Sequence, residues 1–205
     1  MGRMRRVGLT GGIATGKSVV VALLRARGVP CVDADALAHE AMGPGTAVTA
    51  AIVARFGDVR DAEGGVDRSR LAPVIFGDAI ARRDLEAIVH PAVAAGLQRF
   101  FDDRAADGTH ALAVADVPLL YEVGWEGRVE HVLATCCAEA LQLERLRLRG
   151  LSEAEARARL AAQWSARTKA ERADAVIRTD GTMADTAAQV DAWLSSLGAS
   201  RGSMA

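Results

Sequence analysis

The 205-residue chain has few cysteines, no long hydrophobic run and almost no net charge. Its three cysteines are an odd number and two of them are adjacent, which argues against a disulfide framework. The apolar run Val19–Leu24 is far shorter than the about 20 residues of a membrane span, and Val7–Leu9 is too short for the core of a signal peptide. A formal net charge of −1 argues against a protein that neutralises a nucleic-acid backbone. We therefore expect a cytoplasmic protein that binds neither membranes nor nucleic acid, and we favour a monomer.

Lysine is scarce as well. The chain contains 2 lysines against 23 arginines. Because arginine serves almost everywhere that a positive charge is needed, Lys17 and Lys169 become candidates for specific roles. What is abundant is apolar: half of the residues are hydrophobic, and 205 residues suffice for one well-filled domain with lobes.

Short apolar runs alternate along the chain with segments of helical pattern. We predict strands at residues 6–10, 29–32, 111–117, 129–135 and 175–177. We predict helices at residues 18–27, through most of 36–105, as a basic pair across 141–172, and at 183–197. Within 36–105 we expect a loop or hairpin at 57–67, and a helix boundary or kink at His90-Pro91. Alternating strands and helices predict an α/β fold with a parallel sheet.

The residues Gly11-Gly12-Ile13-Ala14-Thr15-Gly16-Lys17-Ser18 fit the pattern of a phosphate-binding loop between a strand and a helix. Glycines let the backbone turn its N–H groups inward, and the following helix presents further N–H groups to the phosphates. Lys17 supplies a mobile positive charge to the β and γ phosphates, and Ser18 supplies a hydroxyl ligand for Mg²⁺. The motif predicts a nucleoside triphosphate and magnesium as ligands and leaves the phosphate acceptor open.

A regulatory GTPase is the first alternative for such a loop. These proteins need a guanine-reading Asn/Thr-Lys-x-Asp, and Thr168-Lys169-Ala170-Glu171 lacks the aspartate. An Asp-x-x-Gly occurs at Asp61–Gly64, but in the predicted polar loop rather than at a strand end, so we attribute it to chance. The sequence favours a small-molecule kinase.

Acidic residues follow two of the predicted strands, at the sheet edge where α/β proteins bind ligands. A carboxylate of Asp33 or Asp35 can face an acceptor hydroxyl there, and the structural alternative is a helix N-cap for one of the two. Asp116 resembles the second acidic residue of phosphate-loop proteins, which holds magnesium through water, and its alternative is an ordinary aspartate at a strand end.

The basic residues across 141–172 allow two interpretations. Gly150 interrupts the helical pattern, and Ser152 with Glu155 forms a capping box that begins the next helix. The arginines either form a solvated surface or belong to a lid that closes over the triphosphate and places an arginine on the transferring group. After a phosphate loop, the pattern favours the lid.

Taken in order, these motifs resemble the dephospho-CoA kinase family from about Met4 to Leu197. The resemblance rests on Leu9–Ser18, Asp33-Ala34-Asp35, His90-Pro91, Pro118–Glu122, Gln142-x-x-Arg145, Gln163, and Lys169 before Ala173–Ile177. It implies an α/β fold of the P-loop nucleoside triphosphate hydrolase type, with a five-stranded parallel sheet flanked by helices. It also implies a nucleotide-binding core (residues 4–35, 108–137 and 173–197), a helical dephospho-CoA-binding insertion (36–107) and a helical lid (138–172).

The resemblance further implies that the chain transfers the γ-phosphoryl group of ATP to the ribose 3′-hydroxyl of dephospho-CoA, the final step of coenzyme A biosynthesis. The implied catalytic residues are Lys17, Asp35 facing the hydroxyl, and Arg145 from the lid. The implied ATP-binding residues are Gly11, Gly12, Ile13, Ala14, Thr15, Gly16, Lys17, Ser18 and Val19. The implied substrate-binding residues are Thr10, Asp33, Asp35, His90, Leu119, Leu120 and Glu122, and the implied Mg²⁺ ligands are Ser18 and Asp116.

The sequence departs from the family pattern in two places. Ala14-Thr15 replaces a commoner Gly-Ser, which requires a backbone conformation at residue 14 that suits alanine. Thr179-Asp180 stands where the family usually has an asparagine before a glycine, which affects the expected selectivity for adenine. Two rival functions remain: another nucleoside or nucleotide kinase, against which the Asp33-Ala34-Asp35 and His90-Pro91 motifs argue, and a non-catalytic nucleotide switch, against which the absent guanine motif argues.

Overall fold

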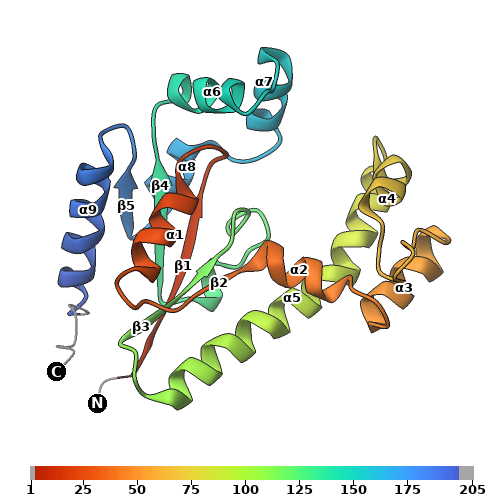
Figure 1. The fold of residues 1–205 in the computed structure, drawn as a ribbon, viewed down its shortest axis with the longest axis horizontal. Coiled ribbons are helices and arrows are strands. Elements are labelled where there is room, and N and C mark those ends of the chain that lie inside the picture. The colour runs from red at the N-terminus through yellow and green to blue at the C-terminus, as the bar shows by residue number, and fades with distance from the viewer. Residues whose placement is uncertain (1–2, 199–205) are drawn as a thin grey trace. The chain divides into compact units, whose positions relative to one another are not determined.

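Five strands form one sheet in the computed structural model, which describes residues 3–198 (Figure 1). The strands are β1 (Arg5–Gly11), β2 (Cys31–Asp33), β3 (Leu112–Asp116), β4 (His131–Cys136) and β5 (Ala175–Arg178). Their order in the sheet is β2-β3-β1-β4-β5, and β1 pairs in parallel with β3 and β4, as β4 does with β5. This arrangement confirms the predicted α/β fold, including the predicted five-stranded parallel sheet.

Helices connect the strands, and polar side chains begin most of them. The helices are α1 (Lys17–Arg25), α2 (Ala34–Ala41), α3 (Ala47–Phe56), α4 (Arg68–Ile75), α5 (Ala79–Asp107), α6 (Glu139–Leu148), α7 (Glu153–Ala161), α8 (Ala166–Arg172) and α9 (Met183–Ser196), with a short 3₁₀ turn at Glu126–Arg128. The capping side chains are Asp33 for α2, Thr46 for α3, Asp67 for α4, Asp78 for α5, Ser152 for α7, Ser165 for α8 and Thr182 for α9. The predicted capping box of Ser152 and Glu155 is confirmed.

The main core lies between the sheet and two helices, α1 and α9. Val7 and Leu9 of β1 point into this core with apolar residues of both helices. Because side chains alternate along a strand, Gly8 and Thr10 point to the opposite face. A Cβ at Gly8 would overlap Leu120 Cδ1, so the missing side chain lets the segment after β3 pack closely on β1. On the same strand, Thr10 donates a hydrogen bond to the carbonyl oxygen of Pro118 (3.0 Å).

The chain divides into two compact units. The smaller is Asp33–Phe100, and the larger comprises the described residues before and after it. The smaller unit has its own core around Ile52, Leu71 and Val89. Its loop at 57–67 is closed by an antiparallel bridge between Arg60 and Val66, which confirms the predicted loop or hairpin. Among residues 3–198, no helix is both long and apolar enough to cross a membrane.

At His90-Pro91 we predicted a helix boundary or a kink, and the boundary is wrong. Helix α5 runs through both residues without interruption over 29 positions. Proline inside a helix costs about 3 kcal/mol, because it removes one hydrogen bond and its ring crowds the preceding turn. Apolar residues on both sides of it, Val89 and Val93 among them, pack into the core of the smaller unit. Burial of this face outweighs the helix-breaking tendency of proline. The sequence pattern reports only that local tendency, so it predicted a boundary here.

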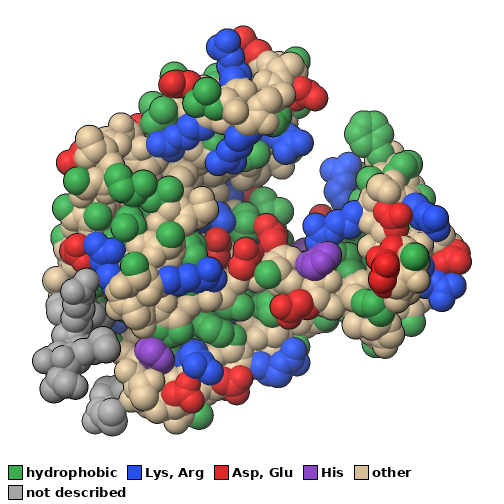
Figure 2. Space-filling view, in the orientation of Figure 1, with side chains coloured by type: hydrophobic (Ala, Val, Ile, Leu, Met, Phe, Trp, Pro, Cys, Tyr) green, Lys and Arg blue, Asp and Glu red, His purple; other side chains and the backbone are tan. Residues whose placement is uncertain are grey.

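The basic segment predicted as two helices contains three. Helices α6 and α7 meet at Gly150 as expected, but a second break at Gln163-Trp164 separates α8. Helix α8 packs against β4 and β1, whereas α6 and α7 pack on each other. Figure 2 shows basic side chains gathered over α6 and α7. The segment thus combines a helical pair rich in exposed arginine with a third helix that belongs to the sheet.

All three cysteines are free thiols, as the sequence predicted. Burial raises the pKa of Cys31 to about 11, and it also raises the pKa values of Cys136 and Cys137. The thiolate is the reactive form, so the folded protein is expected to react with a disulfide reagent at pH 8 at least about tenfold more slowly than the unfolded chain. Absorbance of the released thiol in buffer and in guanidinium measures this ratio. A rapid phase from the folded protein would contradict the expectation.

Candidate active site

The predicted phosphate loop joins β1 to α1, and hydrogen bonds of Thr15 hold it in place. Thr15 closes it: its hydroxyl donates to the Gly12 carbonyl (2.7 Å) and shares a hydrogen bond with the Thr135 hydroxyl of β4 (2.6 Å). Gly16 has φ 81°, a left-handed conformation that suits glycine. The loop is therefore held in its curved shape by contacts from its own side chains and from the sheet.

The start of α1 is open, unlike the capped helices described above. Its N-cap is Gly16, which provides no side-chain hydrogen bond. The first N–H groups of a helix lack partners within the helix, and the helix dipole makes that end positive. The backbone at Lys17 and Ser18 therefore offers a site for an anion such as a phosphate.

Lys17 and Asp116 form an ion pair at this end of the helix. The Lys17 ammonium lies 2.5 Å from Asp116 Oδ1, and the two side chains are 19% and 9% exposed. Asp116 ends β3 and stands opposite Leu9 of β1, so the sheet register brings it to the loop. The structure thus joins two residues that the sequence motifs place separately, and Ser18 lies beside Lys17 with an exposed side chain.

Arg145 of α6 contacts the loop rather than open space. Its guanidinium donates to the carbonyl of Ala14 (3.1 Å) and to the hydroxyl and carbonyl of Thr179 (3.1 and 2.7 Å). The Thr179 hydroxyl in turn donates to the Thr15 carbonyl (2.7 Å). This role of Thr179 could not be recognised in the sequence, where the residue stands out only as a departure from the family pattern. Together the two residues hold the outward-facing carbonyls of the phosphate loop.

Ala14 adopts a left-handed backbone conformation with φ 60°. Its methyl group is buried against Leu146 of α6 and Ala156 of α7. The backbone conformation is one that alanine tolerates at a modest cost, and a β-branched residue tolerates poorly. Position 14 thus requires a small side chain, because a larger one would strain the backbone and would not fit against α6 and α7.

Substitutions of Ala14 are expected to separate these two effects. Ala14→Gly relieves backbone strain but loses one buried methyl group, so the free energy of unfolding should change by less than about 1 kcal/mol. Ala14→Val adds both strain and volume and should lower it by about 3 kcal/mol. Urea denaturation of the two variants and the wild type measures the difference. Equal stabilities of the glycine and valine variants would contradict this account.

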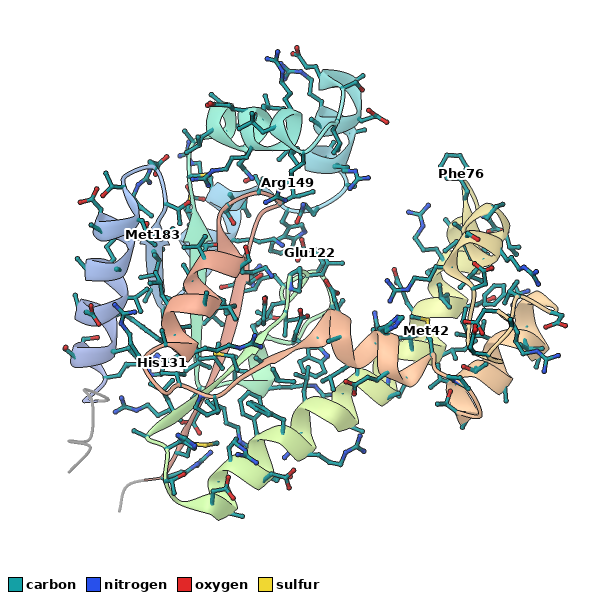
Figure 3. The ribbon with its side chains drawn as sticks, viewed as in Figure 1. Met42, Phe76, Glu122, His131, Arg149 and Met183 are labelled. Carbon is teal, nitrogen blue, oxygen red and sulfur yellow. The ribbon has the colours of Figure 1, made fainter. Side chains whose placement is uncertain are left out.

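The segment after Asp116 is divided between buried and exposed residues. Leu120, predicted to bind substrate, is instead completely buried against Gly8. Thr10 is also completely buried, and its hydroxyl is used by Pro118. Leu119 is 44% exposed and available at the surface. Glu122 (Figure 3) is mostly buried and accepts a hydrogen bond from the backbone N–H of Trp164 (3.0 Å).

Three other predicted residues belong to the smaller unit. Asp33 caps α2 by accepting hydrogen bonds from the backbone of Asp35 (2.8 Å) and Ala36 (3.4 Å), which matches the structural alternative for one of the two aspartates. Asp35 lies in the first turn of α2 with an exposed side chain, and His90 is exposed on α5. Asp35 and His90 are therefore accessible, whereas Asp33 has a structural role.

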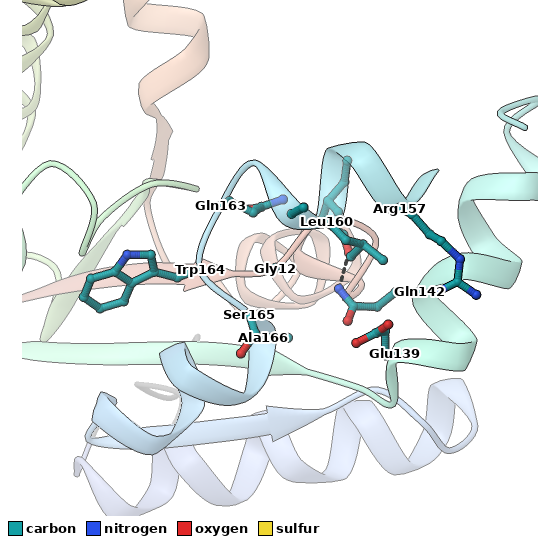
Figure 4. A pocket seen from close by; sticks show the side chains of 11 residues that line it. Gly12, Glu139, Gln142, Arg157, Leu160, Gln163, Trp164, Ser165 and Ala166 are labelled. Atoms are coloured by element: carbon teal, nitrogen blue, oxygen red, sulfur yellow. Dashed lines mark hydrogen bonds between the residues drawn. The ribbon is translucent and has the colours of Figure 1, made fainter. Parts of the chain in front are cut away.

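A pocket of about 290 Å³ lies beside the phosphate loop (Figure 4). Its walls come from Gly12 and Ile13 of the loop, from α6 and α7, and from Gln163 and Trp164 before α8. The Gln142 side chain donates to the Ile13 carbonyl (2.6 Å), so α6 is fastened to the loop here too. Arg157 of α7 is the basic side chain in this wall.

Comparisons with known proteins agree with this geometry. The family model described as dephospho-CoA kinase matches residues 5–185. The dephospho-CoA kinase of Anaeromyxobacter dehalogenans is 49% identical over 97% of this chain and 95% of its own length. The crystal structure of TT1252 from Thermus thermophilus superposes with a TM-score of 0.78 at 34% identity, covering 96% of this chain and 99% of that one. The dephospho-CoA kinase from Campylobacter jejuni, 22% identical, shares the fold with a TM-score of 0.65 over 95% of this chain and 97% of its own.

A phosphate loop with its lysine and aspartate, and a family match across most of the sequence, thus lead to one conclusion. The chain belongs to the dephospho-CoA kinase family.

Proposed function

We propose that this protein transfers the γ-phosphoryl group of ATP to the ribose 3′-hydroxyl of dephospho-CoA. The observation that carries the nucleotide part is the Lys17–Asp116 pair at the uncapped start of α1. The relatives named dephospho-CoA kinase supply the acceptor. In the reaction the acceptor oxygen forms a bond to the γ-phosphorus, the bond from that phosphorus to the β–γ bridging oxygen breaks, and the hydroxyl proton is lost.

Magnesium is part of this proposal. A hydroxyl and a carboxylate are the hard oxygen ligands that Mg²⁺ prefers, and Ser18 and Asp116 offer them beside the loop that would hold the phosphates. The ion would neutralise charge on the β and γ phosphates. Lys17 would also neutralise charge on these phosphates. Its ammonium would leave the Asp116 carboxylate and contact phosphate oxygens instead.

Asp35 is proposed to orient the acceptor hydroxyl. Phosphoryl transfer passes through a loose transition state in which the hydroxyl loses its proton late, so the first requirement is orientation and not a strong base. The exposed carboxylate in the first turn of α2 can accept a hydrogen bond from the hydroxyl and then its proton. His90 and Leu119, both exposed, are proposed to contribute to the acceptor site.

The lid is proposed to consist of α6 and α7 without α8, because α8 packs on the sheet. Arg157, in the pocket wall next to Gly12 and Ile13, is the arginine that can approach the transferring group. Arg145 is proposed to shape the phosphate loop through its contacts with Ala14 and Thr179. This assignment replaces the expectation that Arg145 itself acts on the γ phosphate.

Arg145→Lys distinguishes the two roles. An ammonium cannot reach two carbonyls and a hydroxyl in the way that a planar guanidinium does. We expect the dissociation constant of ATP to rise about tenfold, which corresponds to about 1.4 kcal/mol, with a smaller change in kcat at saturating ATP. Calorimetric titration and steady-state kinetics measure the two quantities. A large fall in kcat at unchanged ATP affinity would assign Arg145 to the transition state instead.

The function is tested by ADP release from Mg-ATP with dephospho-CoA, beside a panel of nucleosides, nucleotides and pantetheine compounds. Release that depends on dephospho-CoA alone supports the proposal, and the product should carry its new phosphate on the 3′-oxygen. Release with a different acceptor would indicate another small-molecule kinase on the same core. Binding of ATP without turnover on any acceptor would favour a nucleotide switch.

A further inference from the structure

Lys169 is the second of the two lysines in the chain and is completely buried. Its ammonium donates to the Pro118 carbonyl (2.6 Å) and pairs with Glu122 Oε1 (2.9 Å). Burial lowers the pKa of Lys169, the Glu122 carboxylate opposes this effect, and the charge of Lys17 adds to it. The Lys17 ammonium is thus near enough for its charge to act on Lys169, although the two lysines come from α1 and α8.

The partners of Lys169 belong to one segment, which follows Asp116 directly. Pro118 accepts from Lys169 through the same carbonyl that accepts from Thr10 of β1. Glu122 Oε1 accepts from the backbone of Trp164 as well as from Lys169. Lys169 therefore holds both ends of residues 118–122 against α8, while Thr10 holds Pro118 to the strand that leads into the phosphate loop.

This ion pair is expected to contribute little to the free energy of unfolding. A buried pair offsets its desolvation cost only when the remaining polar atoms are also satisfied. Glu122 Oε2 is buried and has no hydrogen-bond partner in residues 3–198, and the neighbouring Tyr121 hydroxyl shares this condition. An apolar pair of similar volume would stabilise such a site as well or better. The pair is more readily explained by what it fixes in space.

We propose that Lys169 is a positioning residue for phosphoryl transfer, which holds residues 118–122 in register with the Lys17–Asp116 pair and thereby places the acceptor substrate. Leu119 is the exposed member of the fastened segment, between the two points that Lys169 holds. Only Val117 separates Pro118 from Asp116, so a shift of the segment changes the acceptor position relative to the phosphates. A guanidinium is larger and planar, and it does not fit a fully enclosed site shaped for an ammonium. This inference rests on the proposed function of the site.

The test is the double variant Lys169→Met/Glu122→Gln, which removes both charges and keeps the volumes and the acceptor for the Trp164 N–H. We expect kcat/KM for dephospho-CoA to fall about 10- to 100-fold, since misplacement by about 1 Å has effects of this size. The dissociation constant of ATP should change by less than about twofold, and the melting temperature by less than about 3 °C. The matched control is Arg167→Met/Glu171→Gln, an exposed ion pair on the same helix, which should leave all three quantities unchanged.

Wild-type kcat/KM in the double variant would overturn the inference. A parallel loss of ATP affinity, acceptor turnover and melting temperature would overturn it too, since that result describes a structural pair. Glu122→Gln alone is the second variant: it keeps the shape but leaves the buried ammonium of Lys169 without its carboxylate, so a lower melting temperature is expected with it, and the same split between acceptor and ATP is the test. The wild type is assayed first: no release of ADP with dephospho-CoA would contradict the proposed function, whereas an active wild type with an equally active variant contradicts only the role of Lys169.

Discussion

Lys17→Met is expected to lower kcat with ATP and dephospho-CoA by about 10³-fold, the size of effect seen when a preorganised group is removed from developing charge. Methionine keeps the apolar stem and removes the ammonium that pairs with Asp116. The backbone N–H groups at the open start of α1 remain, so ATP should still bind, with affinity reduced much less than turnover. Coupled detection of ADP and calorimetric titration of ATP measure the two effects.

Two companion variants sharpen this experiment. Lys17→Arg keeps the charge but replaces a compact ammonium by a planar fork, and it should remain strongly impaired if the site needs a point charge. Lys17→Met/Asp116→Asn removes both members of the pair and shows whether a loss of stability contributes. A kcat within tenfold of the wild type in Lys17→Met would remove Lys17 from the transition state, provided that the circular dichroism spectrum is unchanged.

Asp35→Asn is expected to lower kcat by about 10²-fold at unchanged affinity for ATP, within the range attributed to a positioned acid or base. Asparagine has the shape of aspartate but cannot accept the proton that the acceptor hydroxyl must lose. Asp35 also lies outside the phosphate loop and has an exposed side chain, so its replacement should spare both ATP binding and stability. Steady-state kinetics with varied dephospho-CoA and saturating ATP give the relevant values.

Asp33→Asn provides the comparison, because it makes the same chemical change two residues away. Asp33 caps α2, and asparagine is about as good an N-cap as aspartate. We therefore expect it to retain most of the wild-type turnover. Similar losses in the two variants would show that Asp33 contacts the substrate, and no loss in either would remove the Asp-Ala-Asp motif from the reaction.

The sequence allowed us to predict the roles of residues whose contacts lie close by in the chain. The phosphate loop needs glycines, a lysine and a hydroxyl at fixed spacing, and each of these is visible in Gly11–Ser18. The capping box at Ser152 is equally local, because both of its hydrogen bonds join residues three positions apart. Asp116 could be proposed as a site residue because strand ends mark one edge of a parallel sheet, and its pairing with Lys17 follows from the register of β3 on β1.

What the sequence could not provide depends on contacts between distant residues. Thr179 hydrogen-bonds to Thr15 across 164 positions, and no spacing rule connects them. Arg145 resembles any other arginine of a basic helix until its guanidinium is seen against the Ala14 carbonyl. Leu119 and Leu120 are the same residue type, so the sequence cannot tell which of them is buried. In the structure Leu120 is buried because it packs against Gly8, which has no side chain, whereas Leu119 is exposed.

The uncapped start of α1 also has a consequence for mass action. In seven other helices a side chain of the protein accepts hydrogen bonds from the first N–H groups, whereas the N-cap of α1 is Gly16, which has no side chain to do so. A nucleotide that completes this helix binds the folded state and has no comparable site in the unfolded chain. At a free concentration 100 times its dissociation constant it adds about 2.7 kcal/mol to the free energy of unfolding. Bound nucleotide would thereby lower the equilibrium fraction of unfolded chain, which is the form that proteases cleave.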